Sequence, residues 1–177
     1  MGRGYARGAY QAVLGGRSTG TLAAMQSHRK FWPYRDVPTD TISIYDGPDT
    51  FLAEFGAAST GEQVVFAAYW LQAEVLNGGL SQFFSNDTGV LAPEAAIACG
   101  TLGLSALAAK LEEAMRWFGN TYPRERETRE AALAAYETSH PGETPFDSLD
   151  AQVSDLIYDE GPGLEKAAVL FLECNSS

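Results

Sequence analysis

Hydrophobic residues recur at three- and four-residue intervals over most of the chain beyond residue 49, a pattern that predicts helices. Residues 60–76 are apolar almost all round, which is typical of a helix buried at the centre of a domain. We therefore expect one central helix with amphipathic helices packed around it. The clearest amphipathic case spans 104–118, with apolar positions at Leu104, Leu107, Ala108, Leu111, Met115 and Phe118.

Capping residues and prolines divide this region further. Asp49 is expected to cap a first short helix, and Thr60 to begin the central helix with Gln63 as its capping-box partner. Pro93 suits the first position of the next helix. Asp147 is expected to cap a later one. The remaining helices are expected over about 93–102, 123–137, 147–157 and 164–171.

Residues 1–48 differ from the rest, since they show no sustained period and contain several prolines. Ile42 and Ile44 alternate with polar residues, which we interpret as an extended segment. We therefore predict a basic arm and extended segment over 1–48, and one acidic helical domain over 49–177. The expected fold class is all-α, a single-domain bundle of about six to eight short helices with a poorly structured N-terminal arm.

The charge is unevenly distributed along the chain. The net charge is −11, from 23 acidic and 12 basic residues. Residues 1–35 contain six basic residues and no acid, so residues 36–177 carry 6 basic and 23 acidic residues, a net charge of −17. Such a surface repels nucleic acids and membranes and attracts basic proteins. An alternative is that the charge only maintains solubility.

The sequence offers little catalytic chemistry. His28 and His140 have no Cys, Glu or His partner at metal-ligand spacing. There is no phosphate-binding loop, dinucleotide fingerprint or serine nucleophile elbow. Glu112 and Glu113 point to different faces of their helix, so they do not form an acid–base pair. We expect a protein that is not an enzyme and that holds no metal or cofactor.

The two cysteines and the hydropathy indicate the compartment. Cys99 and Cys174 lie in apolar helical surroundings and are predicted to be free thiols of the core. No apolar run approaches the ~18 residues of a membrane span, and no export signal is evident. We therefore expect a cytoplasmic protein.

Acidic residues are concentrated near the C-terminus. Carboxylates one helical turn apart are separated by about 5–6 Å, close to the spacing of successive phosphates on a DNA strand. A row of them is therefore a candidate surface for binding a basic, DNA-binding partner, although an ordinary solvated face would have the same composition. The candidate residues are Asp147, Asp150, Asp155, Asp159, Glu160 and Glu165.

The stretch Asn77-Gly78-Gly79 interrupts the central apolar run and predicts a corner between two helices. Asn and Gly tolerate the positive φ that a helix end often requires. Phe83 and Phe84 are expected to anchor the helix that follows in the core. We expect Gln82 and Asn86 to hydrogen-bond backbone groups at the helix ends. The alternative is a ligand pocket at this corner, with one of these amides pointing into it.

Two short motifs resemble the signature of a known family. The first consists of Glu74, Asn77, Gly78, Gly79, Leu80, Gln82, Phe83, Phe84 and Asn86, with Leu80 where Phe is usual. The second consists of Phe146, Leu149 and Asp150. Over about residues 60–175 the chain thus resembles the bacterial family of small acidic DNA-mimic proteins, a family otherwise described as a domain of unknown function.

The resemblance implies an all-helical domain, often a homodimer. It also implies a role in transcription regulation, since one member binds a helix-turn-helix transcription factor through its acidic surface and displaces DNA. The alternatives are an immunity-type inhibitor of a basic nuclease toxin, or a small ligand-binding protein or enzyme. In the leading interpretation the acidic domain itself binds no nucleic acid.

Overall fold

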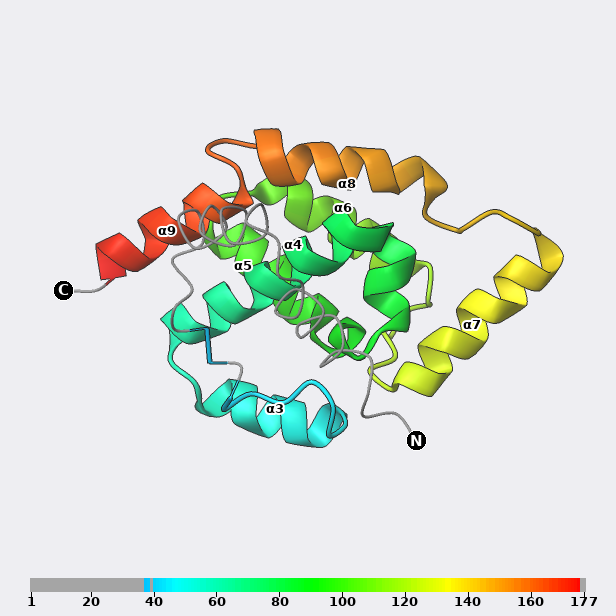
Figure 1. The fold of residues 1–177 in the computed structure, drawn as a ribbon, viewed down its shortest axis with the longest axis horizontal. Helices are drawn as coiled ribbons and strands as arrows, with labels where there is room; N and C mark the ends of the chain where they lie inside the picture. Colours follow the sequence, from blue (N-terminus) through cyan, green and yellow to red (C-terminus); the bar gives the residue numbers. More distant parts are fainter. Residues whose placement is uncertain (1–36, 39, 176–177) are drawn as a thin grey trace, which may run out of the picture. The chain divides into compact units, whose positions relative to one another are not determined.

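The computed structural model describes residues 37–38 and 40–175, which belong to a unit spanning Val37–Ser177. The predicted basic arm falls mainly on residues 1–36, outside the described part. The described residues form seven α-helices and one 3-10 helix without a strand, which confirms the all-α class (Figure 1). The elements are α3 (Pro48–Ala57), α4 (Thr60–Ser85), η2 (Asp87–Leu91), α5 (Ala92–Thr101), α6 (Ser105–Arg116), α7 (Arg126–Ser139), α8 (Asp147–Asp159) and α9 (Leu164–Asn175).

Helix α4 is the central element, as its apolar sequence predicts. It packs against α5, η2, α7, α8 and α9. In Figure 1 it crosses the middle of the helical unit, while α8 runs along one edge. Five consecutive residues, 64–68, are buried and cover every face of the helix there, which explains why this part of the sequence shows no polar stripe. Its buried residues are Val64, Val65, Phe66, Ala67, Ala68, Leu71, Val75, Leu80, Phe83 and Phe84.

Helix α4 begins at Thr60, as predicted, but its N-cap is the preceding residue, Ser59. Ser59 has extended backbone angles, as an N-cap residue requires, and its side chain accepts the N–H of Glu62. Glu62 in turn accepts the N–H of Ser59 at 2.8 Å, which completes a capping box. The prediction of Gln63 as the partner is therefore wrong. The Gln63 amide instead donates to the carbonyl of Phe55 at 2.8 Å, at the end of α3.

Two other predicted caps are also wrong. Asp49 lies inside the first turn of α3, because Gly47 precedes the helix and Pro48 opens it. Asp147 lies in the first turn of α8, and its carboxylate accepts the N–H and the hydroxyl of Thr144, the latter at 2.6 Å. Both acids still interact favourably with the positive end of the helix dipole.

The segment 37–48 belongs to the same unit as the helices. Ile42 and Ile44 are both buried in the core, which the predicted alternation anticipates. The backbone there forms turns and bends, and the Ser43 N–H donates to Glu54 of α3 at 2.6 Å. The predicted boundary groups this segment with the arm, but its buried isoleucines tie it to the helical domain.

An aromatic cluster joins three parts of the chain that lie far apart in sequence. Phe84 at the end of α4 contacts Phe118 with ring centroids 5.2 Å apart and Phe146 with centroids 5.0 Å apart. Trp117 and Tyr122 complete the cluster. Phe83 and Phe84 are fully buried, which confirms that they anchor the segment after the Gly78–Gly79 corner. The two motifs that carry the family resemblance therefore meet in this cluster.

Arg129 of α7 is the largest fully buried side chain of the described residues and is not evident from the sequence pattern. Its guanidinium donates to the carbonyls of Phe84 at 2.7 Å and Asn86 at 3.0 Å, where α4 ends. It also donates to the carbonyls of Pro123 and Arg124. Burial lowers the pKa of Arg129, yet a guanidinium stays charged in proteins. A buried cation thus closes the C-terminal end of α4.

The remaining expectations on cysteines and membranes have mixed outcomes. Both cysteines are free, but only Cys99 is buried, whereas Cys174 is exposed on α9. Burial raises the pKa of the Cys99 thiol to about 12, so it is a packing residue. Along the described part of the chain, every helix falls short of the length and apolarity needed for a membrane span.

Replacing Arg129 by Met is expected to reduce the free energy of unfolding by roughly 3 kcal/mol, because the buried carbonyl of Phe84 and three partly buried carbonyls lose the guanidinium donor. Arg116→Met is the matched control, since Arg116 is exposed, and its effect should stay within about 0.5 kcal/mol. Urea denaturation followed by circular dichroism measures both. Equal stability of the two variants would show that the buried guanidinium does not hold the end of α4.

Candidate functional site

The Gly78–Gly79 corner is a kink within α4, which confirms that it separates two helical segments. Gly78 has φ −158° and ψ 21°, and Gly79 has φ +74° and ψ −173°. Among the described residues only glycines have positive φ, so the expectation that Asn77 shares this role is wrong. A Cβ on Gly79 would lie 2.9 Å from Oδ1 of Asp150. Both the dihedral angles and the space therefore require glycine at 79.

The polar residues of the corner bond to one another. Oε2 of Glu74 accepts the side-chain amides of Gln82 and Asn86, each at 2.8 Å. The expectation that these amides bond backbone groups at helix ends is therefore wrong. Glu74 lies before the kink and the two amides after it, so the carboxylate ties the two segments of α4 together. The observation that suggested a ligand pocket at this corner thus has a structural explanation.

Two of the predicted partner-binding acids bond the backbones of other helices. Oδ1 of Asp150 accepts the Leu80 N–H at 2.8 Å, immediately after the kink in α4. Glu160 follows the last residue of α8, and its two carboxylate oxygens accept the N–H groups of Ala106 and Leu107 in α6, each at 2.8 Å. Burial is the main cause that raises the pKa of Asp150, and the nearby Asp147 adds to it.

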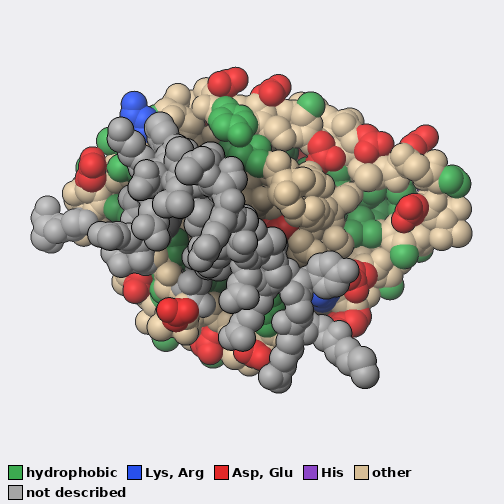
Figure 2. Space-filling model, in the orientation of Figure 1, with side chains coloured by type: hydrophobic (Ala, Val, Ile, Leu, Met, Phe, Trp, Pro, Cys, Tyr) green, Lys and Arg blue, Asp and Glu red, His purple; other side chains and the backbone are tan. Residues whose placement is uncertain are grey.

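Three of the predicted acids form an exposed row on α8. Asp147, Asp155 and Asp159 are all exposed, and α8 contains no Lys or Arg. Asp155 and Asp159 are one turn apart and share one face of the helix, whereas Asp147 lies about 80° around the helix axis from Asp155. Figure 2 shows acidic side chains along the edge that α8 occupies in Figure 1, with few basic ones on the face shown. We call these three residues the α8 stripe. Glu165, the sixth candidate, lies in the first turn of α9 and is only partly exposed.

The basic residues of the unit do not neutralise the α8 stripe. Residues 37–175 contain six basic residues, and most of them contact groups elsewhere in the unit. In the described residues no ion pair involves a member of the stripe. The pairs present are Arg124–Glu94 at 2.8 Å, Arg126–Asp87 at 3.1 Å, Arg126–Glu130 at 2.9 Å and Lys110–Glu113 at 2.8 Å, in addition to the buried Arg129.

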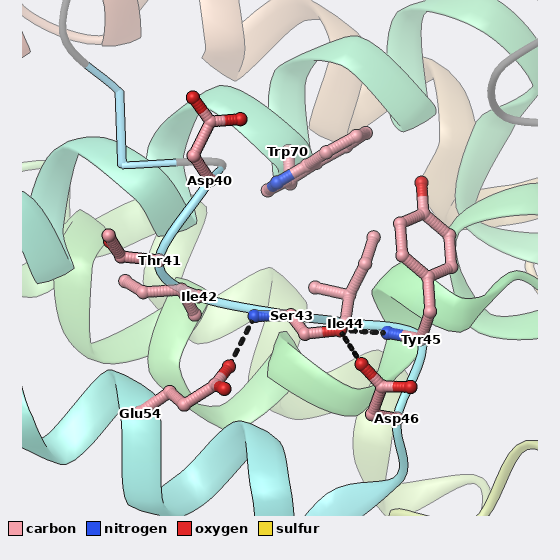
Figure 3. A pocket seen from close by; sticks show the side chains of 9 residues that line it. All are labelled: Asp40, Thr41, Ile42, Ser43, Ile44, Tyr45, Asp46, Glu54 and Trp70. Atoms are coloured by element: carbon pink, nitrogen blue, oxygen red, sulfur yellow. Dashed lines mark hydrogen bonds between the residues drawn. The ribbon is translucent and has the colours of Figure 1, made fainter.

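A hollow of about 390 Å³ is lined by residues of the segment 40–46, by Glu54 of α3 and by Trp70 of α4. Figure 3 shows its lining, in which Ser43 donates through its N–H to Glu54 and through its hydroxyl to Asp46 at 2.7 Å. Asp40 and Trp70 also line it, whereas Gln82 and Asn86 do not. Nowhere in the described residues do three or more His, Cys, Asp or Glu side chains form a group that could hold a metal ion.

The comparisons with known proteins place these features in a family. The protein is acidic and helical, and the acids of its α8 stripe have no ion-pair partner among the described residues. A model of the DMP19-like protein family matches residues 56–175, about two thirds of the chain, so the protein belongs to this family. The searches of curated proteins and of solved structures found no match.

Gly79→Ala is expected to lower the free energy of unfolding by about 1–3 kcal/mol, because its backbone region is essentially restricted to glycine. Gly100→Ala is the control: it lies in α5, where an added Cβ would meet open space, and should be neutral or stabilise by up to about 1 kcal/mol. Thermal denaturation compares the two. A Gly79→Ala protein as stable as the control would remove the conformational reason for this corner.

Proposed function

We propose that this protein is a non-enzymatic DNA mimic that binds a basic, DNA-binding protein and blocks its access to DNA. The observation that carries the proposal is the α8 stripe, three exposed carboxylates on a helix without a basic residue. Membership of the DMP19-like protein family supports it, because the resemblance to DNA-mimic proteins implies this role.

The spacing of the carboxylates in the stripe suits a partner whose surface binds DNA phosphates. With a rise of 1.5 Å per residue, Asp155 and Asp159 are separated by about 6 Å along the helix axis, and Asp147 and Asp155 by about 12 Å. Asp155 and Asp159 therefore present negative charge at an interval near one step of a DNA strand. Asp147 extends the stripe to roughly 18 Å along the helix axis, about 80° around the helix from Asp155. Basic side chains that a DNA-binding protein directs at successive phosphates can bind these carboxylates instead.

The energetics of such binding depend on charge and on a few contacts. Complementary charge accelerates the encounter and makes it sensitive to salt. Tyr158 lies next to the stripe and is 64% exposed. Exposed tyrosines often supply binding energy at interfaces, so we propose that Tyr158 adds an uncharged contact beside the carboxylates.

The test combines capture of a partner with variants of equal net charge. The wild-type protein is used to capture proteins from the cytosol of its source at low salt, with elution by raised salt. We expect a basic DNA-binding protein that loses its DNA when the wild type is added. Asp155→Asn with Asp159→Asn should weaken this binding by at least tenfold. Glu127→Gln with Glu137→Gln removes two exposed acids from α7 and should have a much smaller effect.

The outcomes separate the candidate functions. Equal weakening by both pairs of substitutions would show that net charge acts without the α8 stripe, and would contradict the proposed site. Recovery of a basic nuclease whose activity is inhibited would favour the immunity-type alternative, which uses the same electrostatics. Recovery of only neutral proteins, without salt dependence, would contradict both.

A further inference from the structure

We infer that Asp150 and Glu160 are positioning residues, which dock α8 onto the N-termini of two other helical segments and thereby hold the α8 stripe in place. This inference rests on the proposed function for the stripe itself. The supporting observation is that both carboxylates accept backbone N–H groups from elements far away in sequence, at 2.8 Å in each case.

Both carboxylates accept N–H groups at the starts of helical segments. Helix α6 begins after Leu104, which offers no side-chain hydrogen bond, so Glu160 supplies the acceptor for its first turn. The second segment of α4 begins at the Gly79 kink, and Asp150 accepts the first N–H after it. Free N–H groups and the positive end of the helix dipole favour a carboxylate at both places.

The position of Glu160 has no favourable explanation within α8. It follows the last turn of α8, where the negative end of the dipole disfavours an acid. The two N–H groups of α6 offset that cost. The contact with α6 therefore explains an acid at position 160, and its negative charge binds the start of α6 rather than a partner.

The contacts of Asp150 and Glu160 fix the position of α8 along its own axis, which its apolar face alone does not determine. Leu149, Val153 and Ile157 are buried and determine which face of α8 turns to the core. Apolar contacts are non-directional, so they specify the position along the helix axis less sharply. Hydrogen bonds near both ends of α8, ten residues or about 15 Å apart, define that position. Asp155 and Asp159 of the stripe lie between these two contacts, and Asp147 precedes the first of them by three residues.

The experiment compares two double variants that lose the same charge. Asp150→Ala with Glu160→Ala removes both acceptors, whereas Asp150→Asn with Glu160→Gln keeps an acceptor oxygen at each position. Spin labels on cysteines introduced at Gln152 of α8 and Ala109 of α6, in a Cys174→Ser background, measure the distance between the helices. Both labelled positions are exposed. An alanine-rich helical peptide with arginines at i, i+4 and i+8 serves as the binding probe.

We expect the alanine pair to broaden the distance distribution and to bind the peptide roughly tenfold more weakly than the Asn/Gln pair, since the Asn/Gln pair can keep a neutral hydrogen bond at each position and the alanine pair keeps none. Equal distance distributions in the two pairs would overturn the docking role. Different distributions with equal peptide binding would overturn the link to the stripe. Failure of the wild type to bind peptide or protein partner would contradict the proposed function, and the distances would still decide the docking.

Discussion

The C-terminal end of α4 depends on one buried cation. The last carbonyls of a helix have no partner inside it, and here the carbonyl of Phe84 and that of the C-cap residue Asn86 accept hydrogen bonds from the guanidinium of Arg129. Five donors in a planar group can serve several carbonyls at once, so one side chain closes the helix and fixes α7 against it. The close approach also excludes a side chain at Gly89, whose Cβ would lie 2.7 Å from the Arg129 Nε. The aromatic cluster packs around the same point.

In this unit, negatively charged side chains bind the N-terminal ends of helices and a positively charged one binds a C-terminal end. Asp150 and Glu160 accept N–H groups at helix starts, while Arg129 donates to carbonyls at a helix end. Because both kinds of helix end bind charge of the complementary sign, part of the charge of this chain is structural. Arg124 and Arg126 pair with acids near α7. The basic residues are thus largely used inside the unit, and the acids in excess lie on the surface.

The fold class and the helices could be predicted from the period of the apolar residues, because a helix buried on one face has apolar residues at three- and four-residue intervals. The predicted caps at 49, 60 and 147 are misplaced, because neighbouring Ser, Thr, Asp and Pro residues are similar candidates and the backbone angles decide between them. The contact of Asp150 with Leu80 spans 70 residues and leaves no local trace. Arg129 is likewise hidden in a charged stretch whose other members are exposed or paired.

The same limit applies to the candidate site, where six acids of similar appearance have different surroundings. Asp150 and Glu160 have backbone partners in other helices, whereas Asp155 and Asp159 lie on the exposed face one turn apart. A carboxylate that bonds two N–H groups of α6 loses much of its capacity to bind a partner's cation, and moving it would release those groups. Under the proposed function, α8 therefore carries two sets of acids: one set that would face the partner, and one set that bonds the backbone of other helices and holds α8 in place.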